Sequence, residues 1–305
     1  MRILVIGSVN MDLVVRVDHV PAAGENVRGQ ALEMIPGGKG ANQAVASARL
    51  GAETTFLGRI GDDPFGRRLR DELAAAGVRT DAVQTVAGCA SGTAMILVEA
   101  GGENSIVITP GANARLGPDD VHAARSLLAQ ADAVLLQLEI PAETVARAIR
   151  LAREVGTLAV VDAGPPRRPI DEAVLEADVL TPNEAEAAAL LGINPGTRSP
   201  EDLARALLAR GPRAVVVKAG PRGAVLAEEG LLRHVPAFPI EPVDTTAAGD
   251  AFTAALAVAL VEGKNLVQAT RRAGAAGALA ATRLGAQPAM PTADEVSAFL
   301  SRQEK

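Results

Sequence analysis

Short runs of β-branched and aliphatic residues alternate along the chain with longer Ala- and Leu-rich segments whose apolar positions recur with helical period. This alternation is typical of βαβ units, in which helices connect parallel strands and cover the sheet. The pattern therefore predicts an α/β protein with a mostly parallel sheet. Strands are predicted at residues 3–6, 54–57, 133–138, 158–161, 179–180 and 214–217.

Helices are predicted between these strands, and several begin with proline near the first turn and an acidic residue beside it. Helix starts prefer both features. After residue 242 the pattern becomes entirely helical. The predicted helices span residues 40–50, 64–76, 118–129, 141–155, 184–191, 200–209, 249–262, 266–281 and 293–300.

Two segments interrupt this rhythm, at residues 12–35 and 92–109, because each alternates like a strand with no helix between the strands. Since they are interleaved with the main sheet in sequence, we expect a flap over one edge of the core and not an independent domain. No fixed-period repeat or low-complexity linker divides the chain. We therefore expect residues 1–305 to form a single domain that carries a β lid.

The net charge of the chain and its few aromatic residues bear on whether it binds nucleic acid. The chain has 30 Lys and Arg against 36 Asp and Glu, a net charge of −6, with no Trp or Tyr and 5 Phe. A negative field repels polyanions, and single-stranded nucleic acid needs aromatic stacking surfaces, so we expect no nucleic-acid partner.

Cysteine usage and the apolar runs bear on location. Cys89 has no second cysteine to pair with, and the three histidines are scattered, which predicts neither a disulfide nor a zinc site. No apolar run approaches the roughly 20 residues that span a bilayer. The first ten residues are interpreted as a strand and not as a signal peptide. We therefore expect a cytoplasmic protein with no membrane partner.

The most informative segment is residues 243–250, where a loop of small residues enters a long apolar helix. A helix start offers unpaired N–H groups, and Ala247, Ala248 and Gly249 would let an anion approach them closely. Asp250 would stand at the rim of this cradle, where it could accept a proton from an attacking hydroxyl. The alternative is that Asp244 or Asp250 merely caps the helix.

A glycine-rich turn at residues 36–42 also opens a helix. It lacks the Ser or Thr that follows the lysine in a P-loop, and it lacks the third glycine of a dinucleotide fingerprint. Lys39 and Asn42 nevertheless offer donors suited to a polyol. The alternative is a flexible turn.

Polar residues follow several predicted strands. Asn10, Met11 and Asp12 come after the first strand and Glu139 after another, at the edge where open α/β sheets bind ligands. Asn183 and Glu186 are three residues apart, so they could share a helical face and order water or a metal. A turn preference for residues 10–12 and a helix cap at Asn183 are the alternatives.

Taken together, these segments resemble the PfkB sugar-kinase family, and within it the ribokinase branch, over essentially all 305 residues. The order and spacing of seven motifs carry the resemblance: residues 10–12, 21–25, 37–44, 137–139, 181–184, 243–250 and 285–288. It implies a three-layer α/β/α core with a mostly parallel sheet and a small β-sheet lid. It also implies ATP-dependent phosphorylation of D-ribose at the 5-hydroxyl, giving D-ribose 5-phosphate and ADP.

The resemblance assigns roles to individual positions. Asp250 would be the base, and the amides of Ala247, Ala248 and Gly249 would form the anion hole. The sugar would be held by Asn10, Met11, Asp12, Gly38, Lys39, Gly40, Asn42, Glu139 and Asp250. The residues that would contact ATP and water-bound Mg²⁺ are Asn183, Glu186, Lys218, Gly220, Arg222, Gly223, Gly249 and Gly274. A monovalent cation, usually K⁺, would be bound by Asp244, Thr246, Ala280, Arg283 and Gly285. The lid would close over the sugar and provide a homodimer contact.

Several positions depart from the family pattern. Lys218 stands where threonine is common, Gly274 where some relatives carry His or Asn beside the adenine, and Ala289 where Ser is often found near the cation. Residues 161–166 also differ from the usual Asn-Pro-Ala-Pro. These departures bear on nucleotide and cation binding and leave the proposed base untouched.

Three other functions compete with this interpretation. A kinase for another furanose or a nucleoside would keep the same fold. A non-catalytic sugar-binding protein would have no need of Asp250 beside an anion cradle. A nicotinamide-dependent dehydrogenase would need the dinucleotide fingerprint that the chain lacks.

Overall fold

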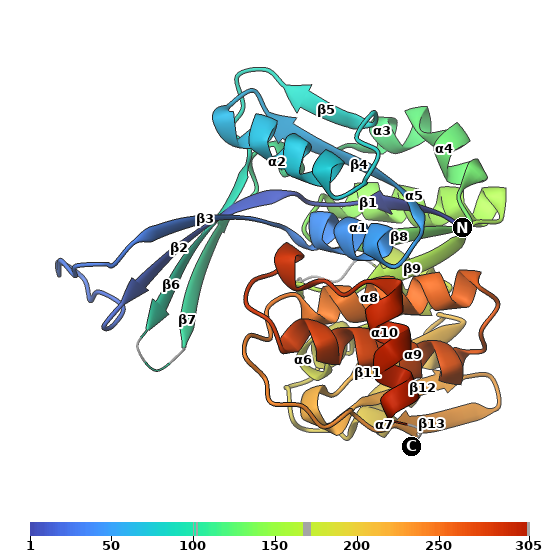
Figure 1. The fold of residues 1–305 in the computed structure, drawn as a ribbon. Helices are drawn as coiled ribbons and strands as arrows, with labels where there is room; N and C mark the ends of the chain where they lie inside the picture. The colour runs from blue at the N-terminus through green and yellow to red at the C-terminus, as the bar shows by residue number, and fades with distance from the viewer. Residues whose placement is uncertain (100, 102, 167–171, 304–305) are drawn as a thin grey trace.

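In a computed structural model of the protein, residues 1–99, 101, 103–166 and 172–303 are described. The large sheet contains the strands β1 (Arg2–Ile6), β4 (Glu53–Gly61), β5 (Val83–Val86), β8 (Ala133–Gln137), β9 (Leu158–Asp162), β10 (Val179–Leu180), β11 (Ala214–Lys218), β12 (Ala224–Glu228) and β13 (Leu231–Val235). Their order is β13-β12-β11-β10-β9-β8-β1-β4-β5 (Figure 1). Neighbours are parallel except at β11–β12 and β12–β13. The predicted mostly parallel sheet is confirmed.

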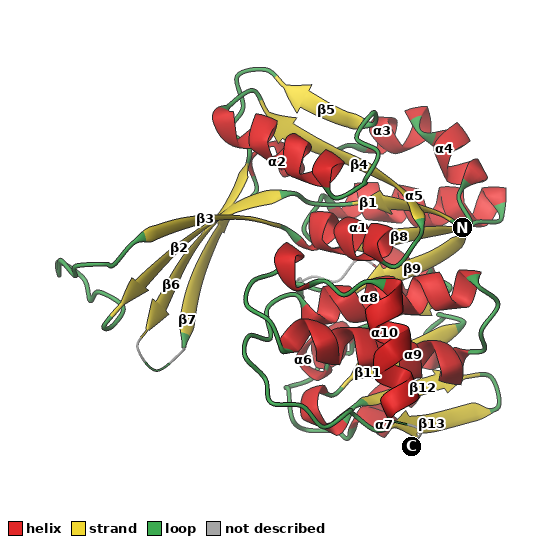
Figure 2. Cartoon of the chain, viewed as in Figure 1, coloured by secondary structure: helices red, strands yellow, loops and turns green. Residues whose placement is uncertain are grey.

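Helices cover both faces of this sheet (Figure 2). One face packs against α1 (Lys39–Arg49), α2 (Pro64–Ala75), α8 (Ala248–Val261), α9 (Leu266–Ala281) and α10 (Ala293–Arg302). The other packs against α3 (Pro118–Ala123), α4 (Arg125–Gln130), α5 (Ala142–Val155), α6 (Glu184–Leu190) and α7 (Pro200–Leu208). Short 3₁₀ turns lie at η1 (Gly111–Arg115), η2 (Glu172–Glu176), η3 (Gly220–Arg222) and η4 (Gln287–Ala289).

The continuous apolar runs of the central strands follow from this three-layer arrangement. Along β1, Ile3 and Val5 belong to the cluster on the first face, and Leu4 and Ile6 to the cluster on the second. Successive side chains of a strand point to opposite faces, so a strand buried on both faces has apolar residues at every position.

Helix ends are fixed by local sequence. Asp63 caps α2 by accepting the Gly66 amide at 2.7 Å, with proline at the first helical position. Gly156 ends α5 in the left-handed region, at φ 78°. The helix α8 is buried almost throughout its length, which explains its uniformly apolar sequence.

The structure differs from the sequence prediction in two places. The helix predicted at residues 118–129 is two helices, α3 and α4, because the chain turns at Ala124. The strands β5, β12 and β13 were not predicted. Two of them form a hairpin that turns at Gly230, with φ 72°, so they do not follow the strand–helix alternation that guided the prediction.

The two irregular segments form a separate four-stranded sheet, as expected. Its strands are β2 (Asn10–Val17), β3 (Leu32–Gly37), β6 (Gly92–Glu99) and β7 (Asn104–Thr109), in the order β3-β2-β6-β7. Residues 100 and 102 of the predicted lid lie outside the described part. Figure 1 shows this lid sheet projecting from the layered core. Among the described helices none combines the length and apolar character needed to cross a membrane.

Candidate active site

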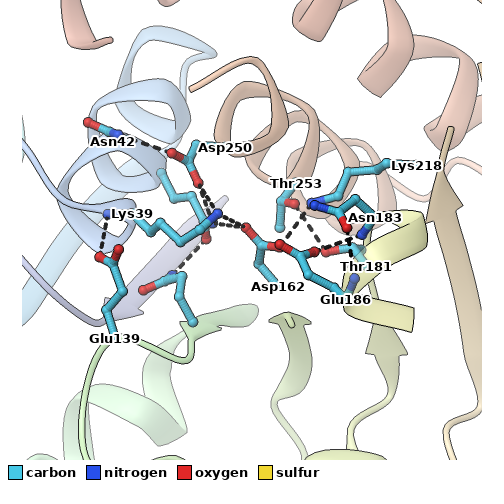
Figure 3. Close-up of polar contacts among 12 residues, drawn as sticks. Lys39, Asn42, Glu139, Asp162, Thr181, Asn183, Glu186, Lys218, Asp250 and Thr253 are labelled. Carbon is cyan, nitrogen blue, oxygen red and sulfur yellow. Dashed lines mark hydrogen bonds and ion pairs between the residues drawn. The ribbon is translucent and has the colours of Figure 1, made fainter. Parts of the chain in front are cut away.

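Polar side chains end several neighbouring strands of the large sheet at one edge. Gln137 is the last residue of β8, Asp162 of β9 and Lys218 of β11, while Asn183 follows β10. Because parallel strands place their carboxyl ends together, residues far apart in sequence meet there. Figure 3 shows Asp162 and Lys218 beside residues of α1 and α8.

Asp250 lies in the first turn of α8 and is 4% exposed. Its Oδ2 accepts a hydrogen bond from Asn42 Nδ2 at 3.0 Å, and its Oδ1 from Gln43 Nε2 at 3.1 Å. Lys39 Nζ lies 3.5 Å from the same Oδ1. Three donors from the first two turns of α1 therefore fix the carboxylate in place, as Figure 3 shows for Lys39 and Asn42.

The start of α8 is open. Ala247 adopts φ 58°, the left-handed region that alanine rarely enters, and no side chain caps the helix. The Ala248 amide donates to the Thr245 carbonyl at 3.2 Å, whereas the Ala247 and Gly249 amides meet no acceptor among the described residues. Asp250 does not cap its helix, so the alternative interpretation of this carboxylate is wrong. Strained backbone of this kind is often found at functional sites.

Asp162 is the centre of a buried ion network. Its side chain is fully buried and accepts from Lys218 Nζ at 2.9 Å, Gln43 Nε2 at 3.0 Å and Lys39 Nζ at 3.1 Å. Burial would raise the pKa of Asp162, but the ammonium groups of Lys218 and Lys39 lower it. Burial would lower the pKa of Lys39, but the carboxylates of Asp162 and Asp250 raise it well above its ordinary value. Both groups therefore stay charged.

The residues assigned to the sugar come from β2, the start of α1, the loop after β8 and, as Asp250, the first turn of α8. Glu139 Oε2 accepts the Lys39 backbone amide at 3.0 Å. Burial, together with the nearby Glu139 carboxylate, raises the pKa of Asp12 to about 7. Asn10 is buried and accepts from Asn113 Nδ2 at 2.7 Å. Met11 is buried in the hydrophobic core, so its side chain serves packing.

The glycine-rich turn allows a close backbone approach. Gly38 has φ 87°, and a methyl group built on it would lie 2.8 Å from the Asn10 amide nitrogen. A methyl group on Gly40 would lie 2.6 Å from the Ser8 nitrogen and 2.7 Å from its carbonyl oxygen. The first turn of α1 thus presses against the segment after β1. The alternative of a merely flexible turn does not account for this contact.

On the nucleotide side, Asn183 caps α6. Its Oδ1 accepts the Glu186 amide at 2.8 Å, and Glu186 Oε2 accepts the Asn183 amide at 2.7 Å. The helix cap expected as the alternative for Asn183 is therefore present, and among the described residues the side-chain nitrogen has no acceptor, so a ligand could still use it. Burial raises the pKa of Glu186. Its Oε1 has no hydrogen-bond donor among the described residues.

The remaining residues assigned to nucleotide lie on two other elements. The turn after β11 has positive φ at both Gly220 and Gly223, and Arg222 pairs with Glu184. Gly274 lies within α9, where a methyl group would be 3.7 Å from the Phe238 ring. The structure therefore places Gly274 against an aromatic side chain.

The residues assigned to a monovalent cation lie in the loop before α8 and around the end of α9, and Asp244 joins the two segments. Its Oδ1 accepts the Thr246 amide and its Oδ2 the Gly285 amide, both at 2.9 Å. The Arg283 amide bonds the Ala280 carbonyl at 3.2 Å. The Arg283 guanidinium pairs with Glu295, and because it is itself a cation, Arg283 could bind K⁺ only through its backbone carbonyl.

Sequence reasoning assigned no role to Asp162, Gln43, Gln137 or Asn113, which support the site. Gln137 Nε2 donates to Gln43 Oε1 at 2.7 Å, so one amide orients the amide that holds both Asp162 and Asp250. Asp162 carried a usable signal, since it is a charged residue at the end of an apolar strand. The two glutamines lie in a helix start and a strand end, where no local pattern marks them.

Comparison with known proteins is consistent with this geometry. Residues 1–293 match the model of the pfkB family carbohydrate kinases. The ribokinase of Bacillus subtilis is 43% identical over 300 residues, covering 98% of this chain and 99% of that protein. A deoxyribokinase of Salmonella typhi is 35% identical over 306 residues, covering 100% of both.

Solved structures share the whole fold. The Arabidopsis thaliana ribokinase complexed with ribose and ATP superposes with a TM-score of 0.90 and 35% identity, covering 98% of each chain. The Thermotoga maritima ribokinase gives 0.89 and 37%, covering 98% of this chain and 99% of that one. With the matching family model and the carboxylate beside an open helix start, these likenesses show that the chain belongs to the pfkB family of carbohydrate kinases, ATP-dependent enzymes that phosphorylate sugars.

Proposed function

We propose that this kinase transfers the γ-phosphoryl group of ATP to the 5-hydroxyl of D-ribose, giving D-ribose 5-phosphate and ADP. The observation that carries the proposal is the placement of Asp250, which lies in the first turn of α8 beside the Ala247 and Gly249 amides, neither of which has an acceptor among the described residues. Ribokinases among the full-length relatives and a superposable complex with ribose and ATP support ribose as the sugar.

In the proposed reaction the sugar hydroxyl attacks the γ-phosphorus while the bond to the β,γ-bridging oxygen breaks. Asp250 accepts the hydroxyl proton, and ADP leaves. The Ala247 and Gly249 amides stabilise the charge on the transferring group, because donors fixed in advance need no reorganisation. Asn42 and Gln43 hold the Asp250 carboxylate at the attacking oxygen.

The sugar is proposed to be held by residues from the lid strand β2 and from α1. Asn10 and Asp12 begin β2, so the lid and the sugar site share a strand. The Glu139 carboxylate and the Lys39 amide already meet at 3.0 Å and would frame the opposite side. Closure of the lid over the sugar would exclude water that could otherwise accept the phosphoryl group.

Two cations fit the residues present. Glu186 has a buried carboxylate with one oxygen unengaged by the described residues, which suits a Mg²⁺ held through water. Oxygen atoms that suit K⁺ are offered by the loop before α8 and by the end of α9 with the loop after it, at Asp244, Thr246, Ala280, Arg283 and Gly285. When bound, Mg²⁺ would neutralise charge on the ATP phosphates.

Coupled ADP release with Mg-ATP tests the proposal. The panel is ribose, deoxyribose, fructose, adenosine and buffer alone, each with and without K⁺. Turnover strongest with ribose and raised by K⁺ is the expected result. Preference for deoxyribose would indicate that this chain is a deoxyribokinase like the Salmonella relative. No turnover with any acceptor would favour a sugar-binding protein without catalytic activity.

Asp250→Asn tests the base within the same assay. We expect kcat to fall by about 100-fold or more while ribose binding survives, because the amide keeps the shape and loses the proton acceptor. Near-full activity in this variant would remove Asp250 from the base role.

We also propose a cytoplasmic homodimer joined through the lid. One face of the lid sheet carries exposed Met34, Met95 and Val107, and the strand registers place these residues side by side across the sheet. An apolar surface of this kind is typical of an interaction site. A second copy of the chain would cover it, and the single Cys89 fits a reducing compartment.

A further inference from the structure

Lys218 Nζ lies between a buried carboxylate and the open start of α8. It donates to Asp162 Oδ1 at 2.9 Å, and a methyl group built on Gly249 would lie 3.6 Å from it. The lysine ends β11, where its backbone amide donates to the Pro182 carbonyl at 2.8 Å. In Figure 3 the side chain extends beside Asn183 toward Asp162. The ammonium therefore stands next to the amides of the proposed anion hole.

The donors of this ammonium are incompletely used. The Lys218 side chain is 13% exposed, and within the described ranges Asp162 is its one hydrogen-bond acceptor. An ammonium has three N–H donors, so two remain for a ligand. Lys39 differs, because its ammonium already reaches both Asp162 and Asp250. Buried donors that lack acceptors are costly, which favours an anionic ligand at this position.

Building on the proposed phosphoryl transfer, we propose that Lys218 is a catalytic residue whose ammonium contacts the phosphoryl group in transit, with Asp162 as its positioning residue. During transfer, the bond from the γ-phosphorus to ADP breaks and the bond to the sugar oxygen forms. Lys218 Nζ is proposed to contact an equatorial oxygen of the phosphoryl group in this transition state. Lys218 keeps its proton throughout, and the hydroxyl proton goes to Asp250. A preorganised cation stabilises such a transition state without reorganising.

Asp162 fixes the direction of the ammonium. Each of its two oxygens accepts a hydrogen bond from a different lysine, Oδ1 from Lys218 at 2.9 Å and Oδ2 from Lys39 at 3.1 Å. Gln43 also donates to Oδ2, which holds the carboxylate against rotation. The Lys218 side chain is thus held in one place before nucleotide binds. A lysine that only attracted ATP by its charge would not need to be fixed in this way.

The test compares Lys218→Met with Lys264→Met, a matched loss of an ammonium just beyond the opposite end of α8, where Lys264 is 40% exposed. In Lys218→Met, Asp162 keeps Lys39 and Gln43, so the variant is expected to fold, with a lower Tm because a buried ion pair is broken. We expect kcat to fall about 100-fold with the KM for the sugar unchanged, the scale of losing one oxyanion donor. Lys264→Met should retain wild-type kcat.

Binding measurements distinguish this role from simple nucleotide binding. Calorimetric affinity is measured for Mg-ADP alone and for Mg-ADP with aluminium fluoride, which occupies the position of the transferring group. We expect Lys218→Met to lose about 100-fold in affinity for the fluoroaluminate complex and little for ADP. Equal losses for both ligands, or no loss for either, would overturn the proposal.

These measurements test the role of Lys218 independently of whether ribose is the substrate. If the wild-type enzyme did not phosphorylate ribose, the substrate assignment would fail, whereas the fluoroaluminate comparison would still decide the role of Lys218. If Lys218→Met did not fold, as judged by thermal unfolding, Lys218→Gln would replace it, with the same losses expected. Wild-type kcat in a folded Lys218 variant would overturn the proposal even if ribose were the substrate.

Discussion

Replacing Gly40 with alanine should destabilise the protein, whereas the same change at Gly274 should stabilise it. Both glycines lie inside helices, and neither has a positive φ. The Gly40 methyl group would meet three backbone atoms at 2.6–2.8 Å, in Ser8 and Gly7. Backbone cannot rotate away, so α1 and the segment after β1 must separate. The Gly274 methyl group would meet only the Phe238 ring, at 3.7 and 3.9 Å, which is ordinary contact.

The magnitudes follow from these contacts. Overpacking costs about 1–3 kcal/mol, and the rigid neighbours of Gly40 place it near the upper end. Alanine regains about 1 kcal/mol of helix propensity, so Gly40→Ala should lose roughly 2 kcal/mol in net stability. Gly274→Ala should gain about 1 kcal/mol by the same propensity. The two variants should therefore differ by about 3 kcal/mol, or about 5 °C in Tm, because the unfolding entropy of a chain of this length is about 0.6 kcal/mol/K.

Denaturant unfolding and thermal melting of the two variants and the wild type would measure this difference. Gly40→Ala should also raise the KM for ribose, because the displaced turn carries the Lys39 amide that donates to Glu139. The reasoning would be refuted if Gly40→Ala matched the wild type in both stability and KM. A higher KM for ATP in Gly274→Ala would support the assignment of that position to the nucleotide site, whereas an unchanged value would count against it.

Three further outcomes are expected. Because the pKa of Asp12 is about 7, its carboxyl is protonated below that pH and ionised above it. The ionised form is the stronger hydrogen-bond acceptor, so the KM for ribose should fall from pH 6 to pH 8. Asp12→Asn should flatten this pH profile. Val107→Lys should convert the proposed dimer to a monomer in light scattering, because Val107 is 66% exposed on the apolar lid face; a persistent dimer would place the interface elsewhere. Asn113→Ala should cost about 3 kcal/mol in denaturant unfolding, since it leaves the Val9 amide and carbonyl and the Asn10 side chain without their partner; a loss below about 1 kcal/mol would mean that water replaces it.

The layered core was predictable because burial on two faces leaves a strong local signal. Strands such as β8, in which every residue is buried, read as uninterrupted apolar runs between helical segments. The β12–β13 hairpin was missed although Gly230 marks its turn, because antiparallel strands at a sheet edge break the alternation. The break between α3 and α4 at Ala124 has no glycine or proline to announce it, since alanine is the best of helix formers.

The site was only partly predictable, because position along a strand is local information and pairing is not. A polar residue after a buried strand places its side chain at the ligand edge, which located Glu139, whereas the role of Lys218 came from the family resemblance. The partners lie far away in sequence, as for Lys39 and Asp162, separated by 123 residues. Gln43 is the clearest case, because nothing around it in sequence distinguishes an amide that bridges two carboxylates from a polar residue on a helix surface.

Two departures from the family pattern turn out to be one structural feature. Lys218 and the segment that contains Asp162 depart separately in the sequence, and they form a buried ion pair at 2.9 Å in the structure. Either charge alone would be costly there, because breaking a buried pair typically loses 3–5 kcal/mol. The cost of burying both charges is offset only where the pair has further hydrogen bonds, which Lys39 and Gln43 provide. A hydrophobic pair would fill the same space with less desolvation, so the retention of two charges beside the open start of α8 is explained better by a need for positive charge at that position than by stability.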